Sequence, residues 1–153
     1  MNPGVTAIMK LVQVGIRLAD SEAQRAERRG ITGVMNLEFT GEDGGGWHVE
    51  FRDGNVRVVP GLAPEPRATM RMTPEVFLAL VAGHQAISVA RMTGRVRLVG
   101  DGNFGPVFSA FVGGLQNAQR LPGVRGWMTR RLVHRALRKG GYQPSPRPAP
   151  PST

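Results

Sequence analysis

Apolar and polar residues alternate with a period of two in five stretches of this chain. In the first of them, Met35, Leu37 and Phe39 alternate with polar residues. Successive side chains of a β-strand point to opposite faces, so each stretch predicts a strand with one apolar and one charged face. The stretches are residues 35–40, 47–52, 56–58, 70–72 and 95–99. Such strands are typical of a sheet with helices on one side and solvent on the other, which argues against a doubly wound fold.

Helical periodicity surrounds these strands. The first predicted helix has an apolar face at spacings of three and four, formed by Val5, Ile8, Met9, Val12, Ile16, Ala19, Ala23 and Ala26. Thr73 followed by Pro74 predicts another helix start, because threonine is a favoured N-cap and proline suits the first helical position. The predicted helices cover residues 5–29, 74–83, a short segment ending at Met92, 103–119 and 124–139. Asp53-Gly54 predicts a tight hairpin between two of the strands.

Positive charge is concentrated at the C-terminal end. Residues 1–101 contain 12 Lys/Arg and 11 Asp/Glu, whereas residues 102–153 contain 8 Lys/Arg and no acid. The length of 153 residues suits one domain. We therefore expect a nearly neutral main domain over residues 1–119, a basic amphipathic helix over 120–141, and a proline-rich, disordered tail over 142–153.

Several patterns could indicate catalysis, and each has a simpler interpretation. Gly100–Gly105 fits G-x-G-x-x-G, but no strand follows its helix and no acid lies downstream to hold a ribose, so a tight strand-to-helix turn is favoured. The three histidines are far apart and show no metal-ligand spacing. Glu38 and Glu50 could face each other across adjacent strands, yet neighbouring arginines favour a solvated salt-bridge surface. No catalytic residue, metal or cofactor is predicted.

The order of several weak motifs carries a family resemblance. The motifs are Met72, Phe77 to Leu80, Gly83, Ala90, the segment from Gly94 to Gly100, and WHVEFRDG at residues 47–54. Together they resemble the sterol carrier protein 2 family over roughly residues 33–116. The resemblance implies an α/β (α+β) fold: a single five-stranded, largely antiparallel sheet, with helices covering one face and an apolar tunnel. It also implies non-catalytic binding, and transfer, of a fatty acid, acyl-CoA, sterol or isoprenoid-like lipid.

The candidate ligand wall consists of apolar residues on the predicted strands and helices. They are Leu37, Phe39, Met72, Phe77, Leu80, Val81, Ile87, Met92, Leu98, Phe104, Phe108, Phe111, Val112 and Leu115. Helical spacing of this kind is also what an ordinary core has, so ligand wall and filled core are both open at this point. Met35, Met70, Met72 and Met92 would give the wall an adaptable surface.

The predicted last helix separates its residues into two arcs. Met128, Leu132, Val133, Ala136 and Leu137 lie on one arc, and basic residues occupy the other. The candidate membrane-binding residues are Trp127, Arg130, Arg131, Arg135 and Arg138. Such a helix suits an anionic membrane surface, although packing of its apolar arc on the domain, as a lid over the tunnel, is the alternative.

Partners and location follow from the same features. We expect a lipid or other long apolar molecule, an anionic membrane surface and a lipid-metabolising enzyme as partners. An accessory subunit that presents a lipid or quinone intermediate to that enzyme is the alternative function. A specific nucleic-acid partner is not expected, because stacking aromatics and binding motifs are lacking. Neither a secretion signal nor a membrane span is recognised, which predicts a cytoplasmic protein that is peripheral at the inner membrane face.

Overall fold

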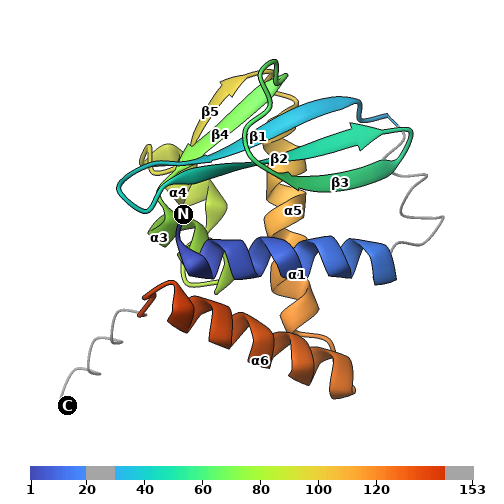
Figure 1. Cartoon of the computed structure of the whole chain (residues 1–153), viewed down its shortest axis with the longest axis vertical. Helices are drawn as coiled ribbons and strands as arrows, with labels where there is room; N and C mark the ends of the chain where they lie inside the picture. The colour runs from blue at the N-terminus through green and yellow to red at the C-terminus, as the bar shows by residue number, and fades with distance from the viewer. Residues whose placement is uncertain (20–29, 144–153) are drawn as a thin grey trace, which may run out of the picture.

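The computed structural model describes residues 1–19 and 30–143. Its elements are α1 (Pro3–Ala19), β1 (Gly33–Phe39), β2 (Gly45–Arg52), β3 (Asn55–Pro60), β4 (Ala68–Met72), α3 (Pro74–Val81), α4 (Ile87–Met92), β5 (Arg97–Gly100), α5 (Phe104–Gln119) and α6 (Gly123–Lys139). A sheet lies at one end of the molecule, with α1 beneath it and α6 beneath α1 (Figure 1). The part of the predicted first helix beyond residue 19, and the tail beyond residue 143, fall outside the described residues.

The strands form one sheet in the order β3-β2-β1-β4-β5. The pair β1–β4 is parallel, and the pairs β1–β2, β2–β3 and β4–β5 are antiparallel. The predicted five-stranded, largely antiparallel sheet is thereby confirmed. Asp53 and Gly54 join β2 to β3 with φ angles of 51° and 81°. Positive φ at both central residues is what a type I′ hairpin turn requires.

One strand begins later than its alternation predicts. β5 begins at Arg97 rather than at Arg95. The reason is a turn after α4, in which the amides of Arg95 and Val96 both donate to the carbonyl of Ala90, at 2.9 and 3.1 Å. Those two amides are therefore unavailable to the sheet, and only the four residues of Arg97–Gly100 pair with β4.

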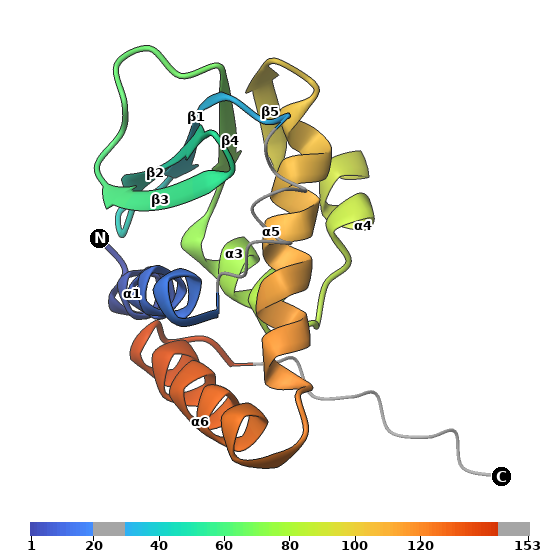
Figure 2. The same ribbon diagram turned by 90° about the vertical axis from the view of Figure 1, so that its right-hand side faces the viewer.

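The apolar face of the sheet is buried and its other face is polar, as the alternation predicts. Leu37 is 0% exposed and lies in register between Trp47 on β2 and Met70 on β4. Helices α1, α3 and α5 lie on this side of the sheet (Figure 2). Their apolar residues and those of the sheet form one core cluster. Burial of a continuous apolar interior is the main stabilising contribution to such a fold.

The polar face carries ion pairs and a loop. Glu38 lies opposite Gly46 on β2 and Arg71 on β4, with 2.6 Å from its Oε2 to the Arg71 Nε. Glu38 and Glu50 do not face each other, because the β1–β2 register places Gly46 opposite Glu38 and Val34 opposite Glu50. The expected salt-bridge surface is present.

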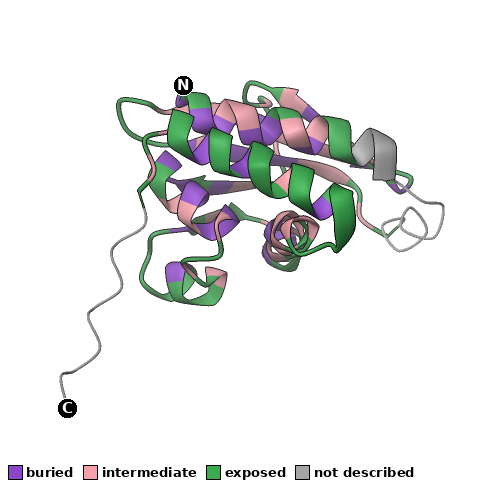
Figure 3. Cartoon of the chain, turned by 90° about the horizontal axis from the view of Figure 1, so that it is seen from below, coloured by how far each residue is buried: buried purple, intermediate pink, exposed green. Residues whose placement is uncertain are grey.

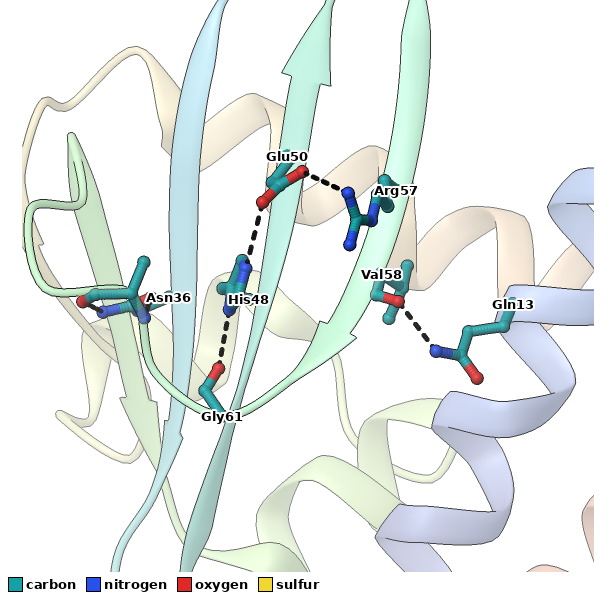
Figure 4. Close-up of polar contacts among 8 residues, drawn as sticks. Gln13, Asn36, His48, Glu50, Arg57, Val58 and Gly61 are labelled. Atoms are coloured by element: carbon teal, nitrogen blue, oxygen red, sulfur yellow. Dashed lines mark hydrogen bonds and ion pairs between the residues drawn. The ribbon is translucent and has the colours of Figure 1, made fainter.

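The neighbouring polar contacts on this face are seen in Figure 4. Glu50 contacts the His48 imidazole at 3.2 Å and the Arg57 guanidinium at 3.8 Å. His48 Nδ1 lies 2.7 Å from the carbonyl oxygen of Gly61. Asn36 is buried on this face, and its side-chain amide has hydrogen-bond partners there: Nδ2 donates to the Ala63 carbonyl at 3.0 Å, and Oδ1 accepts from the Ala63 N–H at 2.9 Å. These contacts hold the β3–β4 connection over the sheet.

Local chemistry explains where two of the helices begin. In α3, the Thr73 hydroxyl accepts a hydrogen bond from the Val76 N–H at 3.2 Å, and Pro74 occupies the first turn. In α1, the Asn2 side-chain oxygen accepts from the N–H groups of Gly4 and Val5, at 2.8 and 3.2 Å. Both caps satisfy amides that a helix start leaves without partners.

Helix α6 forms a third layer on α1 and on the end of α5. Its buried residues include Val133, Ala136 and Leu137, so this part of the apolar arc packs on the domain. Gly4 permits the close approach, since a Cβ there would lie 2.5 Å from the carbonyl oxygen of Ala136. The opposite face of α6 is largely exposed (Figure 3).

Candidate functional site

The interior between the sheet and its helices contains most of the predicted ligand-wall residues. Nine of them are 0–3% exposed: Leu37, Phe39, Met72, Phe77, Leu80, Val81, Phe104, Phe108 and Val112. Four more are partly buried and pack against these: Ile87, Leu98, Phe111 and Leu115. Met92 is 87% exposed and is not brought to this interior. The structure thus collects all of the predicted residues except Met92.

Aromatic rings connect the layers of this interior. Phe39 of β1 meets Phe77 of α3 edge to face, with 5.2 Å between ring centroids. Phe51 of β2 meets Phe104 of α5 in the same way at 6.2 Å. Edge-to-face rings are a favourable aromatic arrangement. These contacts fix α3 and α5 on the sheet.

Sequence reasoning left several members of this interior out of the candidate wall. Trp47, Val49 and Phe51 of β2 are all buried and were not among the candidates. The signal that could have found them is the same alternation that predicted their strand. Helix α1 adds further members, which are Val5, Ile8, Met9 and Val12.

Helix α5 has an apolar surface that is wider than its buried stripe. Phe104, Phe108 and Val112 form the buried stripe, while Val107, Phe111 and Leu115 form a partly exposed stripe beside it. The spacing of four residues in each set places its members along one line of the helix. We call Val107, Phe111 and Leu115 the half-buried stripe. It is a place where the apolar surface of the interior continues toward solvent.

The C-terminal half of α5 is tied to the end of α3 by side-chain amides. Gln116 Nε2 donates to the carbonyl of Leu80 at 2.7 Å, and Gln119 Nε2 donates to that of Val81 at 2.9 Å. Both carbonyls belong to the last turn of α3, where helical partners run out. The two glutamines therefore fix α5 beside the interior without placing a charge in it.

The described interior offers apolar walls and few polar groups. Across residues 1–15 and 30–143, the buried polar side chains are Asn2 and Asn36, and both bond backbone atoms. In the part of the chain that the structure describes, no group of three or more His, Cys, Asp or Glu residues is arranged so that it could hold a metal ion. Such a surface can enclose an apolar molecule and orient it by shape.

The glycine-rich turn before α5 is occupied by structural contacts. Asp101 pairs with the Arg67 guanidinium at 2.7 Å and accepts a hydrogen bond from the N–H of Asn103 at 3.0 Å. Gly100 has φ 102°, and a Cβ there would lie 2.5 Å from the carbonyl oxygen of Arg67. These contacts agree with a tight strand-to-helix turn, as expected from the sequence.

The outer face of α6 combines exposed apolar and basic side chains. A groove of about 680 Å³ runs along it, lined by Trp127, Met128, Arg131, Leu132, His134, Arg135 and Arg138. The Arg131 guanidinium lies over the Trp127 ring, 5.0 Å from its centroid. Arg130 is directed elsewhere, since it donates to the Gln119 carbonyl at the end of α5 at 2.9 Å. Among the described residues, no helix has the length and apolarity to cross a membrane.

Comparison with known proteins identifies the class of protein that this fold and interior define. Residues 14–112 match the sequence model of the SCP-2 sterol transfer family, which is more than half of the chain. The chain therefore belongs to the SCP-2 sterol transfer family. No curated protein is similar enough in sequence to match it.

Solved structures show the same fold at low sequence identity. Apo sterol carrier protein 2 from Yarrowia lipolytica is 17% identical, with a TM-score of 0.58 over 72% of this chain and 90% of that one. Palmitated SCP2L2 from Aedes aegypti is 20% identical, with a TM-score of 0.55 over 71% and 93%. UbiJ-SCP2, a ubiquinone synthesis protein, is 18% identical, with a TM-score of 0.55 over 74% and 99%. The SCP2-like fold is thereby confirmed.

Proposed function

We propose that this protein binds one long apolar lipid between its sheet and helices and carries it without chemical change. The observation that carries the proposal is the half-buried stripe of α5, where the apolar interior continues to the surface. Family membership supports lipid binding in general, and one structural relative, SCP2L2 from Aedes aegypti, is described as palmitated. A fatty acid, acyl-CoA, sterol or isoprenoid-like molecule would fit.

Entry of such a guest needs movement of the protein. Phe77 and Phe108 are 0% exposed, so the protein's own atoms cover them in this structure. Hydrocarbon burial contributes ~0.8 kcal/mol per methylene, and about ten methylenes would contribute about 8 kcal/mol toward displacing that cover. The partly exposed Phe111 is the side chain of the stripe that a chain would meet before Phe108, because the two rings stack at 6.4 Å.

The proposal includes a location. The basic α6 would hold the protein at an anionic membrane surface, so that lipid is exchanged there, and the protein would be cytoplasmic and peripheral at the inner membrane face. Arg131, Arg135 and Arg138 line the outer groove of α6 and are free of the domain interior. Basic residues near an anionic surface contribute ~1 kcal/mol each.

Two measurements test lipid binding. Native mass spectrometry of the purified protein, followed by lipid extraction, should show a retained lipid. In parallel, Phe111→Asp should weaken binding of a fluorescent fatty acid at least about tenfold, because it places a charge on the half-buried stripe. Ala110→Asp is the matched control, since Ala110 is exposed on the same helix. A wild-type protein that retains no lipid and binds no fatty acid contradicts the proposal.

The second candidate function is an accessory subunit that presents a lipid or quinone intermediate to a partner enzyme. The observation that favours it is the structural likeness to UbiJ-SCP2, which is described as a ubiquinone synthesis protein. Co-purification with an enzyme, together with no transfer of lipid between vesicles by the isolated protein, would support this function. Rapid vesicle-to-vesicle transfer by the protein alone would favour the carrier.

A further inference from the structure

The corner between α5 and α6 carries a concentration of exposed apolar side chains. Leu121 is 46% exposed, Val124 70%, Trp127 51% and Met128 51%. Elsewhere in the described chain, the exposed large apolar residues come only one or two to an element or loop: Met1, Val14, Leu62, Val89, Met92 and Val99, with Leu132 on α6 itself. In Figure 2 the corner is the end of the molecule farthest from the sheet. Clustered apolar exposure of this kind marks an interaction surface.

The corner is held in shape by its own contacts. Arg130 donates to the carbonyls of Gln119 and Leu121, at 2.9 and 3.5 Å, and so ties the middle of α6 to the end of α5 and the loop after it. Gly126 lies against the Leu121 carbonyl, where a side chain would have no room. Val133 and Ala136 are buried against the domain. Helix α6 therefore cannot rotate to bury its exposed apolar side chains without exposing these two residues. The exposed apolar side chains therefore belong to a fixed protruding surface.

Positive charge surrounds this surface. Arg120, Arg125 and Arg131 are exposed at or beside the corner. Residues 102–153 contain no Asp or Glu that could neutralise them along the chain. Trp127, with Arg131 over its ring, has the combination of a broad apolar body and a polar edge that is favoured at a bilayer interface. The charge complements an anionic bilayer, and the apolar tip complements its acyl region.

We infer that the α5–α6 corner, residues 120–128, inserts into the surface of an anionic phospholipid bilayer and is the membrane anchor of this protein. The inference deepens the membrane location proposed above and rests on it. Insertion of the corner differs from binding by a helix that lies flat on the membrane. In corner insertion, Leu121 and Val124 contribute most to membrane binding, and the distal Arg135 and Arg138 add only long-range attraction. Corner insertion also assigns roles to Arg120 and Arg125, which the amphipathic arcs of α6 do not reveal.

The test uses the full chain and vesicles of phosphatidylcholine with or without phosphatidylglycerol. Trp127 reports insertion, since Trp47 is 2% exposed and bonded to the Met1 sulfur at 3.1 Å. Addition of anionic vesicles should shift tryptophan emission to the blue and allow quenching by brominated acyl chains. Both signals should disappear in Trp127→Phe.

Variants locate the surface. Leu121→Ser and Val124→Ser should each lower the vesicle partition coefficient about tenfold, as expected for loss of a buried aliphatic side chain. Arg120→Gln and Arg125→Gln should each lower it about fivefold. The matched control is Leu62→Ser with Val99→Ser, because these residues are 48% and 49% exposed on other parts of the chain. This control should partition as the wild type does.

Three results would overturn the inference: no emission shift with anionic vesicles, equal partitioning of the corner variants and the wild type, or equal binding to vesicles without phosphatidylglycerol. Capture of an acidic protein by the corner, without vesicle binding, would also overturn it. Fluorescent fatty-acid binding by the wild-type protein separates the two proposals. If the wild type binds fatty acid and does not bind anionic vesicles, the corner inference alone fails. If it binds vesicles and no fatty acid, the proposed function alone fails.

Discussion

The packing of α6 on α1 depends on Gly4, and replacing this glycine should lower the stability of the protein. Gly4 lies where α1 and α6 touch, and a Cβ there would stand 2.5 Å from the Ala136 carbonyl oxygen and 2.6 Å from the Gly140 Cα. Both are backbone atoms, so Gly4→Ala must push the helices apart. Overpacking of this kind typically costs 1–3 kcal/mol. We expect about 2 kcal/mol lower free energy of unfolding and a Tm lower by roughly 4–8 °C.

Gly15 provides the same chemical change in the same helix without the contact. A Cβ at Gly15 would have no atom within 4 Å. Gly15→Ala should therefore stabilise the protein by roughly 0.5–1 kcal/mol, because alanine is the better helix former. Urea denaturation of the two variants, followed by circular dichroism, measures both signs. Equal changes in the two variants would show that α1 and α6 are not packed as described, and the fixed corner would then lose its support.

Three further predictions concern single side chains. Asn2→Ala should lower the free energy of unfolding by about 2 kcal/mol, because it removes the α1 cap and the 3.1 Å hydrogen bond to the Gly140 carbonyl, whereas Asn2→Asp should retain the cap and lose less in urea denaturation. Phe108→Ala should cost 3–5 kcal/mol, as for a fully buried ring, and Phe111→Ala clearly less in the same assay; equal losses would show that both are ordinary core. Arg71→Ala should change stability by less than about 1 kcal/mol, because its pair with Glu38 is at the surface, and a larger loss would contradict that placement.

The strands could be predicted because alternation is local information. Met35, Leu37 and Phe39 are buried as their period requires. The pairing of β1 with β4 in parallel is different, because it joins residues far apart in the chain and no local pattern specifies it. The start of β5 is another feature that the local pattern does not specify. Alternation continues through Arg95 and Val96 and so predicts a strand there, but the Ala90 carbonyl accepts hydrogen bonds from both amides and keeps them out of the sheet.

The candidate surfaces show a similar division. Helical spacing placed Phe77, Phe104 and Phe108 together correctly, because each also faces the sheet. Met92 has the same apolar character but lies at the end of the short α4, where the chain turns away and leaves it 87% exposed. A helical wheel cannot predict the exposure of Met92, since it gives the direction of each side chain around the helix axis but not which other element, if any, packs against that side.

The apolar arc of α6 could be predicted, but its use could not. The arc joins Met128 and Leu132 to Val133, Ala136 and Leu137, yet only the last three are buried. The difference is one of direction around the helix: Val133, Ala136 and Leu137, with Gly126, face the domain, whereas Met128 and Leu132 line the outer groove. From the sequence alone, membrane contact and packing on the domain are two alternatives for the apolar arc of this helix. In the structure, one side of α6 packs on the domain and the other side is exposed.

Helix α5 gives the two proposed surfaces a physical connection. Its half-buried stripe ends at Leu115, four residues before the helix end at Gln119, which is about 6 Å of helix. The apolar corner begins immediately afterwards, at Leu121. Residues 116–120, between the two surfaces, are polar apart from Ala118, so a lipid that leaves a bilayer at the corner would cross this short polar stretch before it meets Leu115, Phe111 and the interior. Because the gain from burial is proportional to apolar contact area, the apolar surfaces on both sides of this stretch would lower the cost of transfer compared with a route across the polar face of the sheet.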